Sequence, residues 1–135
     1  MTDEKRALVE YRMERARETI GEAKMMFDAG RINTYVNRLY YACFYAVSAL
    51  LLTRGFSTSK HGYLRSLMHR EFVKTGLIPK ELGDHFDMLF DNRLKGDYAD
   101  FIRFKAEQVA GWMKPTEEFI AHIDRLITKL TYPSR

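Results

Sequence analysis

INTYVNRLYYACFYAVSALLLTR, residues 32–54, is the stretch of sequence that decides the fold. Its residues are apolar on nearly every side of a helix, which is typical of the central helix of a bundle. The most apolar part, residues 39–52, includes Ser48 and is only 14 residues long. A membrane-spanning helix needs about 20 apolar residues. We therefore expect a buried core helix and no membrane association.

Four further segments carry apolar residues at helical spacing and are separated by glycine and proline. They cover about residues 3–29, 60–75, 79–95, and from between 99 and 105 to about 131. Five helices with short connections predict an all-α fold, an up-and-down bundle of four to five helices. The length is that of one domain, so we expect a single domain over residues 1–135.

Glycine, proline and capping residues give local expectations within these segments. Gly21 lies in the middle of the first helix, where glycine costs about 1 kcal/mol relative to alanine, and is interpreted as a close helix crossing. Asn33 or Thr34 is expected to cap the central helix. Gly96 is expected to end the fourth helix, and Pro115 to kink or split the last one.

Composition and charge are those of an ordinary folded protein. The chain has 46% hydrophobic and 30% charged residues and a net charge of +4, which permits an anionic partner without requiring one. One cysteine, Cys43, excludes an internal disulfide, and the charged start MTDEKRALVEYRMER is unlike a secretory signal. These features favour a cytoplasmic location. The widely spaced histidines and lone cysteine give no metal signature, so no metal or other cofactor is expected.

Polar residues on the central helix form a seam. Asn37, Tyr41, Tyr45 and Ser48 follow steps of four, four and three, and therefore share one face. Such a seam can serve packing alone, where helices meet. The functional interpretation is a shallow cleft, with Tyr41 stacking on a base and Asn37 or Arg38 contacting phosphate.

Three stretches carry a family resemblance. NRLYYACFYAVSALLLTRG (37–55), STSKHGYLRSLMHREFVKTGLIPKEL (57–82) and FDNRLKGDYADF (90–101) together resemble the small HEPN proteins of bacteria and archaea. The shared pattern is an Asn-Arg-x-Tyr-Tyr helix, a Lys-His after a loop, and an Arg-x-x-x-Asp-Tyr turn, and the resemblance covers about residues 5–130. It implies a helical bundle that forms a homodimer. It also implies a minimal nucleotidyltransferase partner, the two behaving like toxin and antitoxin.

In other branches of this superfamily the domain is a metal-independent RNase, whose signature is an arginine followed after four to six residues by a histidine. Arg93 matches the arginine, but Asp97 and Tyr98 stand where the histidine would be. Arg54 and His61, separated by six residues, fit the spacing in a different element. Where the partner modifies its HEPN protein, the resemblance points to Tyr98 as the target.

Metal-free RNA cleavage needs a base, an acid and a cation that stabilises the phosphorane. Histidine suits the acid–base role with a pKa of about 6.5, and arginine suits the charge role. Tyr98, with an ordinary pKa of about 10, and Asp97, with one of about 3.9, do not suit the acid–base role. We therefore expect Arg93, Asp97 and Tyr98 to bind or position a ligand rather than cleave it. An Arg93–Asp97 pair that ends the helix, and a surface position for His61, are the structural alternatives.

Three functions remain open at this point: a nucleotide- or RNA-binding subunit that pairs with a nucleotidyltransferase, a metal-independent endoribonuclease, and a ligand-free helical adaptor. The first two require the fold to gather Asn37, His61, Arg93 and Tyr98 into one polar pocket. The candidate residues are, for catalysis, Arg93, Tyr98 and His61, and, for binding, Asn37, Arg38, Tyr41, Arg54 and Asp97.

Overall fold

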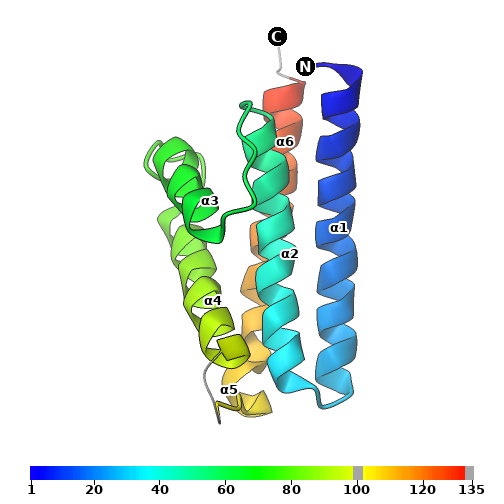
Figure 1. The fold of residues 1–135 in the computed structure, drawn as a ribbon, viewed down its shortest axis with the longest axis vertical. Helices are drawn as coiled ribbons and strands as arrows, with labels where there is room; N and C mark the ends of the chain where they lie inside the picture. The colour runs from blue at the N-terminus through cyan, green and yellow to red at the C-terminus, as the bar shows by residue number, and fades with distance from the viewer. Residues whose placement is uncertain (99–101, 133–135) are drawn as a thin grey trace.

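The computed structural model describes residues 1–98 and 102–132, except for the side chains of residues 94–98 (Figure 1). The helices are α1 (Asp3–Asp28), α2 (Ile32–Leu52), α3 (His61–Met68), α4 (Lys80–Tyr98), α5 (Ala106–Val109) and α6 (Met113–Thr131). A π-helical turn, His69–Val73, continues α3, and a 3-10 turn, Ala110–Trp112, joins α5 to α6. The described residues form five helical stretches and no strand, which confirms the predicted all-α bundle.

Helix α2 lies at the centre of the bundle. It packs against α1, α3, α4 and α6, and 12 of its 21 residues are buried. Figure 1 shows α1 and α6 running alongside it, while α3 and α4 form a hairpin on its other flank. In the part of the chain that the structure describes, no helix is long and apolar enough to span a membrane. Because 12 of its 21 residues are buried, the nearly uniform apolarity of α2 reflects its place inside the bundle.

Contacts between aromatic rings join α2 to the helices around it. The ring centroid of Tyr40 lies 5.7 Å from that of Phe86 and 5.8 Å from that of Phe90, both on α4. Phe86 in turn stacks on Phe119 of α6 at 5.9 Å. Tyr40, Phe86 and Phe119 are all fully buried. Aromatic pairs contribute about 0.5–1.5 kcal/mol each beyond area burial, so this chain of rings fixes where Tyr40 sits.

The structure differs from the expectations for Gly21, Gly96 and Pro115. A Cβ built on Gly21 would meet nothing within 4 Å, so the expected close crossing is wrong, and this glycine is simply exposed on α1. Gly96 does not end α4, which continues to Tyr98. Pro115 falls in the first turn of α6, where a missing N–H costs no helical hydrogen bond. The expected split lies just before it, at the 3-10 turn.

The start of α2 also differs from expectation. Its N-cap is Arg31, without a side-chain cap, so neither Asn33 nor Thr34 caps the helix. The Asn33 side chain instead binds the segment before α5: its amide donates to the carbonyl of Ile102 at 2.9 Å and accepts from the backbone N–H of Phe104 at 2.9 Å. Asn33 therefore does not cap the helix but links α2 to the segment before α5 through two hydrogen bonds.

Candidate functional site

Three helices converge on one group of aromatic and basic side chains, which we call the His61 cluster: Tyr40 and Tyr41 of α2, His61 of α3 and Arg93 of α4. The Tyr40 hydroxyl lies 2.7 Å from Nδ1 of His61. The Arg93 guanidinium lies over the Tyr40 ring, 4.9 Å from its centroid, and its Nη1 is 3.5 Å from the Tyr41 hydroxyl. The fold therefore brings Tyr41, His61 and Arg93, which are far apart in sequence, to the same place.

Burial differs among the members of the cluster. Tyr40 is fully buried and Arg93 is 6% exposed, whereas Tyr41 and His61 lie at the boundary with solvent. The imidazole of His61 stacks on Phe44, with ring centroids 4.5 Å apart, and meets the edge of Tyr41 at 5.7 Å. A ligand would consequently meet Tyr41 and His61 first, because Arg93 is buried beneath them.

The protonation of His61 follows from its surroundings. Burial, and then the positive charge of Arg93, lower the pKa of His61 below its ordinary value, so the imidazole is neutral near pH 7. Burial raises the pKa of Tyr40, so its hydroxyl keeps its proton. Among the described residues, that hydroxyl has His61 Nδ1 as its hydrogen-bond partner and therefore donates to it. The proton of the neutral ring then resides on Nε2, which makes His61 a hydrogen-bond donor.

Asn37 and Arg38 extend the cluster along α2. The Nε and Nη2 of Arg38 donate to the Asn37 side-chain oxygen at 3.0 and 2.7 Å, and its Nη1 donates to Glu22 at 3.4 Å. The Arg38 guanidinium also lies 5.3 Å from the Tyr41 ring centroid. Two of the predicted binding residues, Arg38 and Tyr41, are therefore in mutual contact beside His61.

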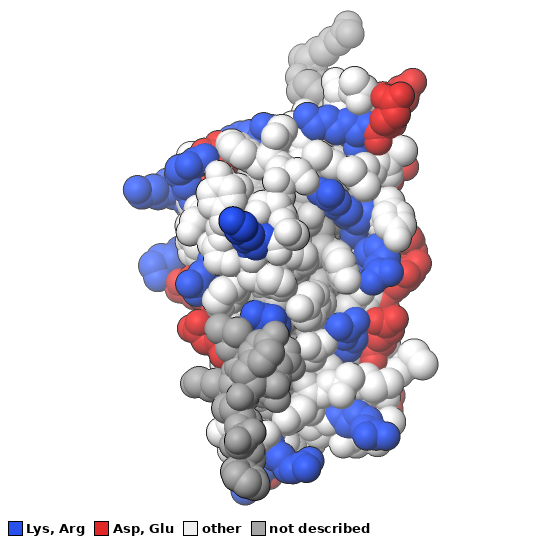
Figure 2. Space-filling view, in the orientation of Figure 1, with Lys and Arg blue, Asp and Glu red and all other residues white. Residues whose placement is uncertain are grey.

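Two arginines of α1 complete the seam and escaped the sequence analysis. Arg15 donates to the Tyr45 hydroxyl at 3.0 Å, and Arg12 donates to the backbone oxygen of Ser48 at 3.3 Å. Their spacing of three residues places them on one face of α1, and this was the signal available in the sequence. The polar face of α2 is accordingly lined by arginines. Figure 2 shows Lys and Arg side chains over α1 and α2 on this side of the molecule, with Asp and Glu mostly towards its edges.

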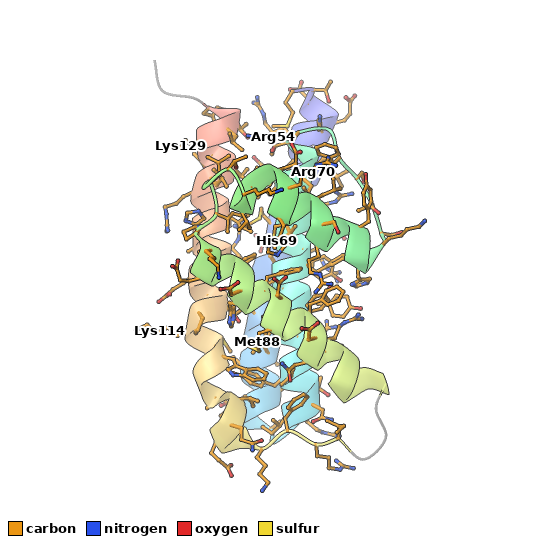
Figure 3. All side chains as sticks on the ribbon, turned by 90° about the vertical axis from the view of Figure 1, so that its left-hand side faces the viewer. Arg54, His69, Arg70, Met88, Lys114 and Lys129 are labelled. Carbon is orange, nitrogen blue, oxygen red and sulfur yellow. The ribbon has the colours of Figure 1, made fainter. Side chains whose placement is uncertain are left out.

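Arg54 lies apart from the His61 cluster. It forms an ion pair with Glu71 at 3.8 Å, and its guanidinium lies 4.8 Å from the Phe72 ring centroid. In Figure 3 it lies near Arg70, at the end of the bundle where α2 finishes. The last residue of α2, Leu52, is already about 18 Å along the helix axis from Tyr40, given a rise of about 1.5 Å per residue. Arg54 and His61 therefore do not act as a pair here.

Asp97 and Tyr98 occupy the last turn of α4, about one turn beyond Arg93. Their side chains lie outside the described residues. Both the predicted Arg93–Asp97 pair and the position of Tyr98 relative to His61 therefore stay predictions.

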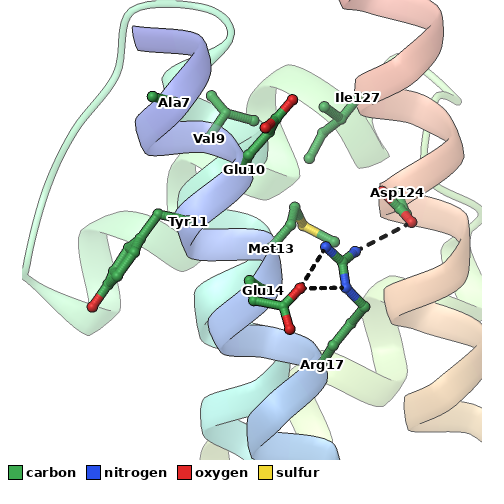
Figure 4. Close-up of a pocket in the computed structure, with 9 residues that line it drawn as sticks. All are labelled: Ala7, Val9, Glu10, Tyr11, Met13, Glu14, Arg17, Asp124 and Ile127. Atoms are coloured by element: carbon green, nitrogen blue, oxygen red, sulfur yellow. Dashed lines mark hydrogen bonds and ion pairs between the residues drawn. The ribbon is translucent and has the colours of Figure 1, made fainter. Parts of the chain in front are cut away.

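Other candidate sites in the described part of the chain lack the chemistry of the His61 cluster. A hollow of about 640 Å³ lies between α1 and α6, but the cation that lines it, Arg17, is neutralised by Glu14 at 3.2 Å and by Asp124 at 3.5 Å (Figure 4). In the described part of the chain, no three His, Cys, Asp or Glu side chains are placed to hold a metal ion. The one cysteine, Cys43, is buried, and burial raises its pKa, which makes it a poor nucleophile.

Comparisons with known proteins agree on one family. The family model of the HEPN domain matches residues 9–126. A protein of Thermotoga maritima named UPF0332 protein is 44% identical over 128 residues, which cover 95% of this chain and 97% of the relative. A candidate toxin of Methanocaldococcus jannaschii is 31% identical over 100 residues, 74% of this chain and 68% of the relative.

A solved structure shares the fold. The crystal structure of TT1696 from Thermus thermophilus superimposes with a TM-score of 0.73 over 87% of this chain and 97% of that chain. The sequence identity is 15%, so this similarity supports only the arrangement of the helices.

Proposed function

The chain belongs to the HEPN domain family, and from this premise we propose that it is a toxin-like HEPN subunit that binds RNA or a nucleotide. The observation that carries the proposal is the His61 cluster, in which a neutral imidazole N–H, two tyrosine rings and a guanidinium meet between three helices. The similarity to candidate toxins of Methanocaldococcus jannaschii supports the toxin-like role.

The exposed groups of the cluster suit a nucleotide. Tyr41 offers a partly exposed aromatic ring for a base, and Arg38, whose guanidinium lies over that ring, offers donors suited to phosphate oxygens. The Nε2–H of His61 is a further donor for a phosphate or a base oxygen. The Arg93 guanidinium lies over Tyr40 and within 3.5 Å of the Tyr41 hydroxyl, so it helps to hold Tyr41 in position.

Mutation of the exposed members tests this proposal. We expect the wild-type protein to bind fluorescein-labelled tetrauridylate and UMP. Tyr41→Ala should weaken the binding of both by about 5- to 150-fold, the range for loss of one stacked base. His61→Ala should weaken it by about 10- to 150-fold, as for loss of a hydrogen bond to a charged group. Tyr63→Ala is the control, since Tyr63 is 51% exposed on α3. Fluorescence anisotropy and calorimetry give the affinities. Equal binding by wild type, Tyr41→Ala and His61→Ala would show that the cluster is not the site.

Pairing with a minimal nucleotidyltransferase and homodimerisation are also part of the proposal, and they follow from the family resemblance of the three motifs. In this scheme the nucleotidyltransferase transfers a nucleotidyl group from a nucleoside triphosphate to the Tyr98 hydroxyl, with release of pyrophosphate and the phenolic proton. Co-expression with a nucleotidyltransferase encoded beside the gene, followed by affinity purification and mass spectrometry, tests the pairing and the modification of Tyr98. Failure to co-purify, or an adduct on a residue other than Tyr98, would count against them.

The second candidate function, metal-independent RNA cleavage, draws on the same histidine. A neutral His61 carrying its proton on Nε2 can act as the acid that protonates a leaving oxygen. The buried Tyr40, with its raised pKa, cannot serve as the base that takes the 2′-hydroxyl proton. Incubation of the purified protein with RNA in EDTA decides the matter: cleavage that His61→Ala abolishes would establish the nuclease, and intact RNA would leave binding as the function. No binding and no cleavage would favour the ligand-free adaptor.

A further inference from the structure

A hollow of about 450 Å³ adjoins the His61 cluster, between α1, α2 and the loop that leads into α3. The side chains that carry the argument are Arg12, Arg15, Tyr45, Thr58, Ser59 and His61. Among the described residues, no Asp or Glu lines the hollow, and His61 belongs both to its lining and to the cluster.

The two arginines of this hollow are held in place by neutral groups. Arg15 donates to the Tyr45 hydroxyl at 3.0 Å, and its guanidinium lies 4.9 Å from the Tyr45 ring centroid. Arg12 donates to the Ser48 carbonyl at 3.3 Å, and partial burial lowers its pKa. A guanidinium has five N–H donors, so these contacts orient the two side chains and leave further donors for a ligand.

Neither arginine has a carboxylate partner in the described part of the chain. Arg17, only two residues further along α1, is paired with both Glu14 and Asp124. Two guanidiniums about one helical turn apart, without a carboxylate partner among the described residues, favour the binding of an anion. The hydroxyls of Thr58 and Ser59 add donors that phosphate accepts readily.

The hollow and the His61 cluster form a continuous surface. The Phe44 ring lies 4.5 Å from the His61 ring and 6.0 Å from the Tyr45 ring, measured between centroids, so aromatic faces run from one site to the other. Guanidiniums alternating with partly exposed aromatic rings suit single-stranded nucleic acid, whose phosphates and bases they can contact.

We propose that Arg12 and Arg15 form a phosphate subsite next to the His61 cluster, so that the ligand is a single-stranded oligonucleotide rather than a mononucleotide. This inference rests on the function proposed above. UMP has one phosphate, which the cluster and Arg38 hold, whereas an oligonucleotide places a further phosphate in the hollow.

The double substitution Arg12→Gln with Arg15→Gln tests the subsite. We expect its affinity for tetrauridylate to fall at least tenfold, while its affinity for UMP changes less than twofold. The slope of log affinity against log salt should decrease by about 0.7, since one phosphate contact to a single strand contributes about that much. Arg17→Gln with Lys24→Gln is the matched control: it removes the same charge from the same helix, where both cations pair with carboxylates.

The outcomes separate the inference from its premise. The separate subsite is refuted if the double variant binds tetrauridylate as tightly as the control does. It is also refuted if the affinities for UMP and tetrauridylate fall by the same factor, and the His61 cluster is then the whole site. If the wild-type protein binds neither probe, the proposed function itself fails. Circular dichroism melting of each variant shows whether a loss of binding is a loss of folding instead.

Discussion

Replacing Tyr40 with phenylalanine tests the hydrogen bond on which the state of His61 depends. The ring of Tyr40 is fully buried and contacts Phe86 and Phe90, and phenylalanine keeps these contacts. What disappears is the 2.7 Å bond to His61 Nδ1, and such a bond contributes about 1 kcal/mol net. With an unfolding entropy of about 2.1 cal/mol/K per residue, a chain of 135 residues should lose about 3–4 °C in Tm.

The same substitution should raise the pKa of His61 towards its ordinary value. The Tyr40 hydroxyl donates to Nδ1 and so stabilises the neutral imidazole, and loss of this bond makes protonation easier. Calorimetry measures the Tm, and an NMR titration of the histidine ring signals measures the pKa. Tyr63→Phe, on the exposed side of α3, is the control and should change neither. A Tyr40→Phe protein with unchanged Tm and unchanged His61 pKa would refute the bond and the tautomer derived from it.

Three further predictions concern stability. Gly21→Ala should raise the free energy of unfolding by about 0.8–1.0 kcal/mol in urea denaturation, because alanine favours the helix and its Cβ meets nothing. Asn33→Ala should lower it by about 1 kcal/mol and speed amide exchange at Phe104, since the clamp on the segment before α5 is lost. Burial lowers the pKa of both His61 and His85, so below about pH 6.5 the unfolded chain takes up protons before the folded one does. Stability should therefore fall as pH decreases from 7.5 to 5.5, and replacing both histidines with glutamine should flatten that part of the curve.

Helical spacing was enough to predict the bundle, because the apolar period of each helix reports directly on the face it buries. The uniform apolarity of residues 32–54 identified the central helix correctly. Local sequence signals were less reliable where tertiary contacts determine the partners of a side chain. Asn33 has the chemistry of a cap, yet its amide binds a segment about 70 residues away, and no local pattern shows that.

The candidate site could be predicted only in part. The steps of four and three along α2 correctly placed Tyr41 and Tyr45 on one polar face, and the motif resemblance singled out His61 and Arg93. The partners of these residues depend on how helices cross. Tyr40 was not among the candidate residues, although its hydroxyl bonds to His61, because one hydroxyl does not show in an apolar pattern.

The partners of Arg54, Arg12 and Arg15 likewise depend on helix packing and could not be predicted from the sequence. Arg54 fits the RNase spacing by count, but the length of α2 carries it away from Tyr40 to pair with Glu71. Arg12 and Arg15 look like ordinary surface charges of an amphipathic helix. Only packing against α2 shows that, within the described residues, they face tyrosine and carbonyl groups rather than carboxylates.

The central claim is that folding gathers Tyr41, His61 and Arg93 into one ligand site, and the four histidines of the chain provide its most direct test. NMR spectra of the histidine rings would be recorded while tetrauridylate is added to the wild-type protein. The account predicts a saturable shift of the His61 signals, while those of His85 and His122, on the α4 and α6 side of the bundle, stay in place. Unchanged His61 signals at saturating ligand would contradict it.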